Sequence, residues 1–242
     1  MIQSTIKKMK QYFLFDLVNQ INNKNIMSVI LTVYAKIYKS SFNGESVIIK
    51  ESKKHNIIFY ESLIYQKIDN KCQNIPLFYK YEKLAKFSRL IIQNTGISLD
   101  KIKDFNIYSI FKLYSDINKS LAFLHSINII HGDLKPGNIT YNQQENKYYL
   151  IDFNLATDDL NKYKVSNRYF LGNKEFSSLN VYKGRNPGYK DDYISLIYIC
   201  LYLYTGKLPW KLTDEKLKLS NAEIKQFYKK DDRLIEFLLS KL

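Results

Sequence analysis

Glycine, proline and cysteine are all scarce in this chain of 242 residues, which contains 8 Gly, 4 Pro and 2 Cys. So little glycine and proline excludes collagen-like and proline-rich linker architectures. Two cysteines, Cys72 and Cys200, are too few for a disulfide framework. Their apolar neighbours predict that both stay reduced, as in an intracellular protein. We therefore expect a globular chain that folds around a hydrophobic core.

Long hydrophobic runs are also missing. The longest uncharged apolar run, residues 193–206, is shorter than the ~20 residues that cross a bilayer, so it predicts a buried core helix. Near the N-terminus, Asp16 interrupts the apolar stretch and no small-residue cleavage site follows, which argues against a signal peptide. We expect no membrane partner.

Acidic residues are few relative to basic ones. The chain has 37 Lys and Arg and 23 Asp and Glu, which gives a formal net charge of +14. Such a charge favours acidic partners, among them nucleic acids and phosphorylated proteins. The lysines are nevertheless scattered among many Asn, Ile and Tyr along the whole chain, which is typical of a compositional bias rather than a dedicated patch. We therefore expect no nucleic-acid partner.

The first third of the chain is rich in strand-like sequence. Asn43-Gly44 is a hairpin turn signal, and apolar residues at helical spacing predict a helix over 56–68. Runs rich in β-branched and aromatic residues predict strands at 28–34, 46–50, 77–79 and 89–92. These elements predict a small antiparallel sheet with one helix. This sheet-rich part of the chain would end near residue 94.

The remainder of the chain is mostly helical. An amphipathic pattern predicts a helix over 107–126, a short strand follows at 147–151, and a hydrophobic helix is expected over 192–204. A sheet-rich first part and a helix-rich second part predict two lobes, and a cleft between lobes is where ligands bind.

One segment has the residue spacing that phosphoryl transfer needs. It reads His131-Gly132-Asp133-Leu134-Lys135-Pro136-Gly137-Asn138, and Asp152-Phe153-Asn154 follows the next hairpin. Transfer of a phosphoryl group needs hard oxygen ligands for Mg²⁺ and a carboxylate that accepts the proton of the attacking hydroxyl. We expect Asp152 and Asn138 to hold metal and Asp133 to face the acceptor hydroxyl.

Two residues earlier in the chain complete this set. Lys50 ends the predicted strand Val47-Ile48-Ile49-Lys50, and Glu61 lies on the helix that follows. In this order they predict an ion pair in which Glu61 fixes the Lys50 ammonium on the α- and β-phosphates of ATP.

On these residues the chain resembles a eukaryotic-type protein kinase, closest to the casein kinase I and vaccinia-related kinase group. Further matches to that group run from about Val33 to Trp210 and are Asn43-Gly44-Glu45, Gly96-Ile97-Ser98-Leu99, Ser177-Ser178-Leu179-Asn180, Asp191–Leu196 and Leu208-Pro209-Trp210. The resemblance implies an α+β, two-lobed protein-kinase-like fold in a single domain over 1–242. Its N-terminal lobe would cover about 1–94 and would contain an antiparallel sheet and one helix. Its C-terminal lobe would cover about 95–242 and would be shortened and mainly helical.

The resemblance also implies roles for single residues. Asp133 and Lys135 would be catalytic, with Lys135 contacting the transferred phosphate. Asp192 would hydrogen-bond the catalytic-loop backbone, and His131 would brace that loop. Ile92 would guard the back of the adenine pocket, and the backbone of Gln93, Asn94 and Thr95 would bind the base. His55 and His125 show no metal-ligand spacing.

The implied activity is that of a serine/threonine protein kinase that uses ATP with Mg²⁺ or Mn²⁺. It would act in the cytoplasm or nucleus of a host cell on protein substrates, which we expect to be acidic or phosphorylated. The expected basic residues beside the acceptor are Arg168, Lys174, Lys183, Arg185 and Lys190. The sequence does not indicate an oligomeric state.

The chain departs from the family pattern in three places, and two alternatives stay open. The three positions of the glycine-rich phosphate loop fall at Ile26, Ser28 and Leu31, although Asn22, Asn23 and Asn25 offer other turns. Asn154 replaces a glycine, and Gly132 replaces an arginine.

The missing glycines favour a pseudokinase with weak nucleotide binding, whereas the intact Lys50, Glu61, Asp133, Asn138 and Asp152 favour activity. A small-molecule phosphotransferase also uses His-Gly-Asp-Leu, but Lys135 and the segments 177–180 and 208–210 argue against it.

Overall fold

The structure is a computed structural model that describes residues 29–32, 35–158, 173–210, 221–228 and 232–242. The chain divides into two compact units. The first consists of the residues up to Ile58 together with Tyr79–Asn94, and the second of Phe59–Phe78 together with Thr95–Leu242. Several positions of the sequence analysis lie outside the described residues, namely Asn22, Asn23, Asn25, Ile26, Ser28 and Arg168.

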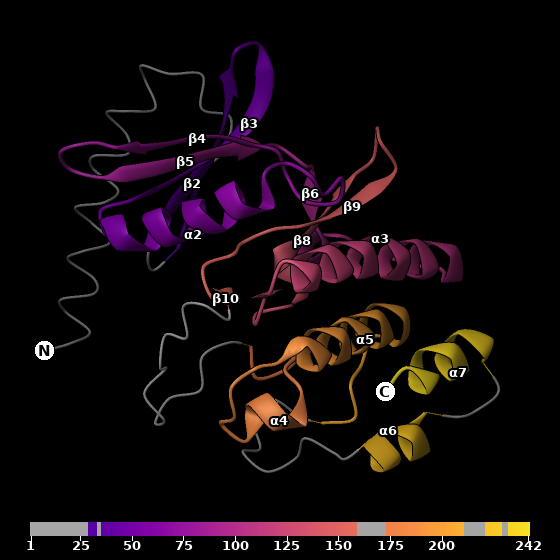
Figure 1. Cartoon of the computed structure of the whole chain (residues 1–242). Coiled ribbons are helices and arrows are strands. Elements are labelled where there is room, and N and C mark those ends of the chain that lie inside the picture. Colours follow the sequence, from indigo (N-terminus) through magenta and orange to yellow (C-terminus); the bar gives the residue numbers. More distant parts are fainter. Residues whose placement is uncertain (1–28, 33–34, 159–172, 211–220, 229–231) are drawn as a thin grey trace, which may run out of the picture. The chain divides into compact units, whose positions relative to one another are not determined.

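The first unit contains a five-stranded sheet in the order β1-β2-β3-β5-β4 (Figure 1). Its strands are β1 (Val29–Leu31), β2 (Lys36–Phe42), β3 (Glu45–Ser52), β4 (Phe78–Lys83) and β5 (Ser88–Gln93). The pairs β1–β2, β2–β3 and β3–β5 are antiparallel, as the sequence predicts. The strand β2, whose bounds the sequence analysis did not delimit, pairs with β3 through the predicted turn.

The turn at Asn43-Gly44 sets the register of that hairpin. Both residues have positive φ, 51° and 82°, which is the geometry of a two-residue hairpin turn, so Phe42 lies opposite Glu45. Alternate side chains of the paired strands then point to one face. The core of this unit on that face is formed by Tyr38, Val47, Ile49 and Ile91, with Phe42 and Tyr79 packed against it.

The second unit is mainly helical. Its helices are α3 (Ile107–Ser126), α4 (Leu179–Tyr182), α5 (Tyr189–Thr205), α6 (Asn221–Phe227) and α7 (Arg233–Ser240), together with most of α2 (His55–Ile68). Short strands form two small sheets, in which β6 (Ile97–Ser98), β8 (Ile139–Asn142) and β9 (Lys147–Leu150) form one and β7 (Ile129–Ile130) and β10 (Thr157–Asp158) the other. Two 3₁₀ turns, η1 (Leu99–Lys101) and η2 (Pro136–Asn138), complete the unit.

The helix α3 spans the residues that its amphipathic pattern predicts. Asn106 caps it by accepting the Ser109 N–H at 2.9 Å, and its apolar side packs between α5 and β9 (Figure 1). Five of its apolar side chains are fully buried, namely Ile110, Leu113, Ile117, Leu121 and Leu124. Such a continuous buried stripe anchors the helix that leads into the segment His131–Asn138.

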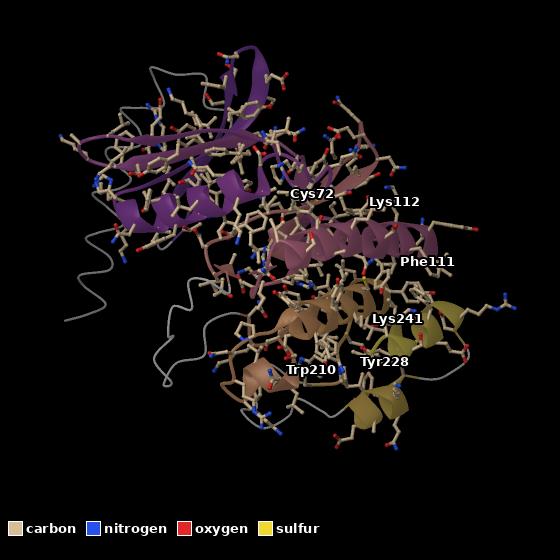
Figure 2. The ribbon with its side chains drawn as sticks, viewed as in Figure 1. Cys72, Phe111, Lys112, Trp210, Tyr228 and Lys241 are labelled. Carbon is tan, nitrogen blue, oxygen red and sulfur yellow. The ribbon has the colours of Figure 1, made fainter. Side chains whose placement is uncertain are left out.

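The helix α5 is apolar on nearly all sides because it lies in the core of the second unit. It begins three residues before the predicted start and ends at Gly206, whose φ is +74°. Trp210, labelled in Figure 2, packs edge-on against Tyr198 of α5 and donates its Nε1–H to the Glu175 carbonyl at 2.9 Å. Both cysteines are buried and free, as predicted. Across the described part of the chain, no helix combines the length and apolar character that crossing a membrane requires.

A tight contact between β6 and β8 holds the start of the second unit. Gly96 has a φ of +98°, and a Cβ built on it would lie only 2.1 Å from the Tyr141 carbonyl oxygen. Thr95, the preceding residue, pairs with Thr140 of β8 through their hydroxyl groups at 2.7 Å. Only glycine fits at position 96, because any other residue would combine backbone strain with a clash against the main chain.

We therefore expect Gly96→Ala to lower the free energy of unfolding by about 2–4 kcal/mol, the sum of left-handed strain and overpacking. The matched control is Gly44→Ala, because Gly44 also has positive φ but its Cβ would meet nothing within 4 Å. That control should cost only about 1–2 kcal/mol. Urea denaturation measures both values, and equal losses would contradict the role assigned to the β6–β8 contact.

Candidate active site

The segment between β7 and β8 places three predicted site residues in contact. The buried Asp133 accepts hydrogen bonds through Oδ2 from Lys135 Nζ at 2.5 Å and from Asn138 Nδ2 at 3.0 Å. The same Nδ2 group donates to the Asp133 carbonyl at 2.8 Å. The second carboxylate oxygen, Oδ1, is buried and has no hydrogen-bond partner among the described residues. One carboxylate oxygen of Asp133 is thus anchored by two side chains, whereas the other is not bonded to any described residue.

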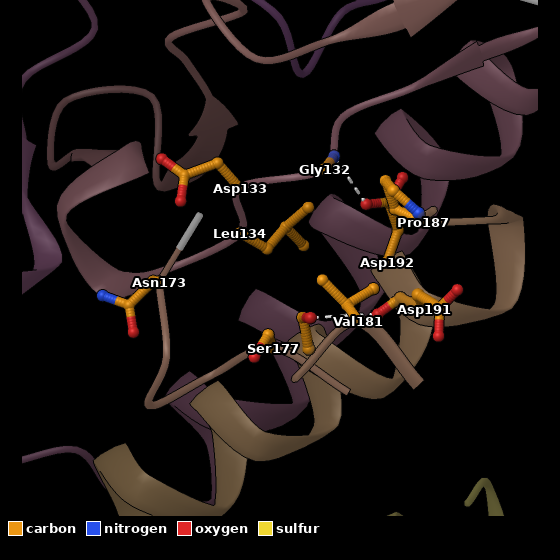
Figure 3. A pocket seen from close by; sticks show the side chains of 10 residues that line it. Gly132, Asp133, Leu134, Asn173, Ser177, Val181, Pro187, Asp191 and Asp192 are labelled. Carbon is orange, nitrogen blue, oxygen red and sulfur yellow. Dashed lines mark hydrogen bonds between the residues drawn. The ribbon is translucent and has the colours of Figure 1, made fainter. Parts of the chain in front are cut away.

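The side chain of Asp192, in the first turn of α5, binds backbone N–H groups of this segment. Its Oδ2 accepts the His131 N–H at 2.9 Å. Its Oδ1 accepts the Gly132 N–H, also at 2.9 Å (Figure 3). His125 Nε2 lies 3.0 Å from the same Oδ2, and the Asp192 side chain is only 2% exposed. The predicted contact between Asp192 and the catalytic-loop backbone is confirmed. A carboxylate in a first helical turn is also stabilised by the helix dipole.

Gly132 and His131 complete the path of this backbone. Gly132 has a φ of +74°, and a Cβ on it would meet the Leu155 carbonyl oxygen at 3.2 Å, so glycine suits this position better than arginine. His131 accepts the Asp133 N–H through Nδ1 at 3.3 Å, and its Nε2 lies 3.1 Å from the Ile151 carbonyl oxygen. The imidazole thus bridges two backbone segments, which confirms its bracing role.

Asp152 lies at the end of β9, close to residues of α2. It has a φ of +67°, and the N–H of the next residue, Phe153, donates to Glu61 Oε1 at 3.3 Å. The Phe153 ring lies edge-on to the Tyr65 ring at 5.1 Å and packs against the His131 ring at 5.3 Å. Burial and the nearby carboxylates of Glu61 and Asp152 raise the pKa of Tyr65 well above its usual value. The structure thus brings Glu61 to the Asp152-Phe153 segment.

Asn154 stands where the family pattern has a glycine. The residue is exposed, and it is not among the residues with positive φ. An asparagine therefore costs no left-handed strain at this position.

The predicted nucleotide-contact residues are distributed over both units. In the first unit, Lys50 of β3 is buried opposite Leu90 of β5, and Ile92 of the same strand is buried as well. The Lys50–Glu61 pair stays a prediction, because Glu61 belongs to the second unit.

Of the segment expected to bind the base, Gln93 ends β5, Asn94 follows in the first unit, and Thr95 begins the second. The Asn94 N–H already donates to the Ser46 carbonyl at 3.1 Å. We therefore do not expect that N–H to bind the base, which leaves the role to the backbone of Gln93 and Thr95.

A pocket beside Asp133 is lined by apolar Leu134, Val181 and Pro187 (Figure 3). One wall contains Ser177 and Val181, and Asp191 anchors the intervening segment. Ser178 Oγ donates to Asp191 Oδ1 at 2.5 Å, and Asn180 Nδ2 donates to Oδ2 at 3.3 Å. The segment Ser177–Asn180 stands where the family pattern has Ala-Pro-Glu, and it is bonded to α5, the helix whose Asp192 holds the His131 and Gly132 backbone.

The side chains near Asp133 fit a hard divalent cation. No cluster of three or more His, Cys, Asp or Glu suited to a metal is found in the described ranges. Mg²⁺ needs only one or two protein oxygens when phosphate oxygens and water supply the rest, and Asp152 and Asn138 offer a carboxylate and an amide oxygen. Because Asp133 engages the Asn138 Nδ2 group, the Asn138 Oδ1 atom is directed away from that carboxylate.

Sequence reasoning missed three contributors to this site. His125 contacts Asp192, Tyr65 packs against Phe153, and the Ser98 hydroxyl donates to the Gly137 carbonyl at 3.1 Å. The spacing of Tyr65 from Glu61, one helical turn, is a signal that both occupy one face of α2. Nothing local marks His125 or Ser98, since their partners lie far along the chain.

Comparison with known proteins identifies the family of this arrangement. The family model of the protein kinase domain matches residues 17–238. A probable serine/threonine-protein kinase of fowlpox virus (strain NVSL), FPV212, is 36% identical over 161 residues, which cover 60% of this chain and 52% of that protein. The chain thus spans about half the length of this relative.

Two more distant matches agree with it. A probable casein kinase I homolog of Encephalitozoon cuniculi (strain GB-M1), ECU03_0910, is 23% identical over 216 residues, covering 81% of this chain and 70% of that protein. The solved structure of vaccinia related kinase 3 superimposes with a TM-score of 0.68 at 21% identity, covering 78% of this chain and 68% of that chain. The last match shows the two-lobed kinase fold that the sequence predicts.

We expect Asp192→Ala to lower the free energy of unfolding by at least ~3 kcal/mol, because two backbone N–H groups and His125 lose a buried acceptor. Asp100→Ala is the control, since Asp100 is exposed and the same change there should cost under about 0.5 kcal/mol. Thermal and urea unfolding measure both. Similar small losses for the two variants would show that the Asp192 contacts contribute little.

Proposed function

The chain belongs to the protein kinase domain family, and from this premise we propose that it is an ATP-dependent serine/threonine protein kinase. It would transfer the γ-phosphoryl group of ATP to Ser or Thr hydroxyls of proteins. The observation that carries the proposal is the state of Asp133, whose Oδ2 is held by Lys135 and Asn138 while its buried Oδ1 has no hydrogen-bond partner among the described residues. A carboxylate presented in this way orients an acceptor hydroxyl and takes its proton.

The neighbouring residues have separate tasks in this proposal. Lys135 places a positive charge beside Asp133, where it would also contact the transferred phosphoryl group. Asp152 and Asn138 would hold Mg²⁺ or Mn²⁺, which when bound neutralises the phosphate oxygens. Lys50, with Glu61, would bind the α- and β-phosphates, and the backbone of Gln93 and Thr95 would bind the adenine beside Ile92.

A pseudokinase is the second candidate, because non-glycine residues occupy the phosphate-loop positions, including Leu31 of β1. Against it stands the presence in the sequence of Lys50, Glu61, Asp133, Asn138 and Asp152. Of the residues around Asp133, Lys135 and Asn138 are hydrogen-bonded to it. The family model and the relatives' names also favour a protein kinase over a small-molecule phosphotransferase.

The reduced, buried Cys72 and Cys200 support an intracellular location, in the cytoplasm or nucleus of a host cell.

We further propose that the substrates are acidic or phosphorylated near the acceptor residue. Four exposed basic residues lie close in sequence to the pocket wall, namely Lys174, Lys183, Arg185 and Lys190. Their field would raise the association rate of anionic substrates and would be screened by salt.

The activity is tested by Asp133→Asn with Asp152→Asn as its comparison. We expect Asp133→Asn to lower turnover by about 10²–10⁴-fold, because the amide cannot accept the proton, while Mg²⁺–ATP binding stays near that of wild type. Asp152→Asn should weaken metal binding and turnover together, because it loses a ligand. Transfer of labelled phosphate to casein measures turnover, and the shift in melting temperature with Mg²⁺–ATP measures binding.

Two results would contradict the kinase proposal. Asp133→Asn with wild-type turnover would show that Asp133 is not the base. A wild-type protein that binds Mg²⁺–ATP but transfers phosphate to no protein acceptor would favour the pseudokinase.

The substrate preference is tested with an acidic and a basic peptide of otherwise equal sequence. At low salt we expect a higher kcat/KM for the acidic peptide, and the difference should shrink as the ionic strength approaches about 1 M. Arg185→Glu should reduce the preference, whereas Lys225→Glu on α6, also exposed and with the same change in net charge, should not. A preference for the basic peptide at low salt would reject the proposal.

A further inference from the structure

The Ser98 side chain connects β6 to the backbone just before Asn138. Its hydroxyl lies 3.1 Å from the Gly137 carbonyl oxygen and 3.4 Å from that of Pro136, and it donates its proton to these two acceptors. The residues it reaches belong to η2, the single 3₁₀ turn that ends at Asn138. This contact joins residues 38 and 39 positions apart, so it is a tertiary contact rather than a local turn.

Other hydrogen bonds hold the two ends of the turn η2. The Pro136 carbonyl also accepts the Ile139 N–H, and Asn138 Nδ2 donates to the Asp133 carbonyl and carboxylate. The backbone of the turn closes through the Asn138 N–H, which donates to the Lys135 carbonyl at 2.9 Å, and the Asn138 carbonyl accepts the Ile151 N–H at 3.0 Å. Gly137 has no side chain, and a Cβ placed on it would meet only Asp100 Oδ2, at 3.9 Å. At Gly137 no side chain contributes packing, and its carbonyl accepts a hydrogen bond from the Ser98 hydroxyl.

The element that carries Ser98 is itself rigidly placed. Ser98 pairs with Thr140 in the β6–β8 ladder, Thr95 bonds Thr140 through its hydroxyl at 2.7 Å, and Gly96 lies against the Tyr141 carbonyl. Because β8 begins directly after Asn138, β6 contacts the chain on both sides of that residue. The Ser98 hydroxyl is thus presented to η2 from a fixed support.

We propose that Ser98 is a positioning residue of the metal site: by holding the Pro136 and Gly137 carbonyls it fixes the backbone from which Asn138, bonded to Asp133 through Nδ2, presents Oδ1. This inference rests on the proposed function in one respect, since it takes Asn138 as a metal ligand. Ser98 itself touches neither metal nor substrate. Its loss should change the metal requirement of nucleotide binding more than the stability of the fold.

The test compares Ser98→Ala and Ser98→Thr in the full chain, with Ser126→Ala as the control. Ser126 is exposed, and its hydroxyl also donates to a backbone carbonyl, that of Phe123 at 2.7 Å, but at the end of α3. For each protein, the Mg²⁺ concentration that gives half of the ATP-induced shift in melting temperature is measured, and the titration is repeated with Mn²⁺. Binding of ADP without metal and the melting temperature without ligand are measured alongside.

We expect Ser98→Ala to need about 3- to 10-fold more Mg²⁺, the range that corresponds to one lost hydrogen bond. Ser98→Thr, which keeps the hydroxyl, should need nearly the wild-type concentration, and Ser126→Ala should match wild type. Metal-free ADP binding should stay unchanged in all variants. If the proteins also transfer phosphate, Ser98→Ala should regain most of its turnover at high Mg²⁺.

Three outcomes would overturn the inference. Ser98→Ala could need no more Mg²⁺ than wild type, or Ser98→Thr could need as much Mg²⁺ as Ser98→Ala. In the third, Ser98→Ala would lose metal-free ADP affinity by the same factor by which its Mg²⁺ requirement rises. A wild-type protein with no Mg²⁺-dependent shift would overturn it as well. A changed metal requirement in a protein that transfers no phosphate would support the role of Ser98 while rejecting the proposed kinase activity, so the two failures are distinguishable.

Discussion

The buried carboxylate of Asp192 is the constraint on which the catalytic segment depends. A loop that presents polar side chains to a ligand cannot satisfy its own backbone with a regular ladder, so its N–H groups need other acceptors. Asp192 supplies two of them to consecutive residues, His131 and Gly132, and reaches His125 with the same carboxylate. Since Asp192 lies in the first turn of α5, whose residues 195–201 are all buried, the loop is fixed to a helix in the core of the second unit.

The departures from the family pattern differ in their physical cost. Gly132 has positive φ and a carbonyl close to its missing Cβ, so here the family's arginine would be the strained residue. Because position 132 is a glycine, it also has no guanidinium group that could bind a phosphorylated segment. Asn154 is exposed with an ordinary φ, so it costs nothing locally. Neither substitution therefore argues for a degenerate site, and the argument for a pseudokinase depends on the phosphate-loop positions alone.

Much of this fold could be predicted because its signals are local. The periodicity of α3, the Asn43-Gly44 turn and the β-branched run of β3 each act within a few residues, and the structure confirms all three. Contacts between distant residues left no such trace. The hydrogen bond of Ser98 to Gly137, the Glu61 contact with the Phe153 N–H and the use of the Asn94 N–H by Ser46 depend on packing that no short pattern encodes. The grouping of Phe59–Phe78 with the second unit follows from the same cause, because Glu61 and Tyr65 pack against Phe153.

The division of the chain into two units also separates the questions of chemistry and of nucleotide affinity. The proposed base, its lysine and both proposed metal ligands lie in the second unit, where Lys135 and Asn138 are hydrogen-bonded to Asp133. The missing glycines belong to sequence that precedes β2, in the first unit, where they would affect how closely the backbone approaches the phosphates. A poor phosphate loop weakens binding, but it removes neither the proton acceptor nor the metal ligands. The polar set is expensive to keep if it has no use, because Asp133 buries an oxygen with no partner among the described residues. A buried carboxylate oxygen without a partner weakens the fold, so its presence at this position favours a role in binding or catalysis over a purely structural one.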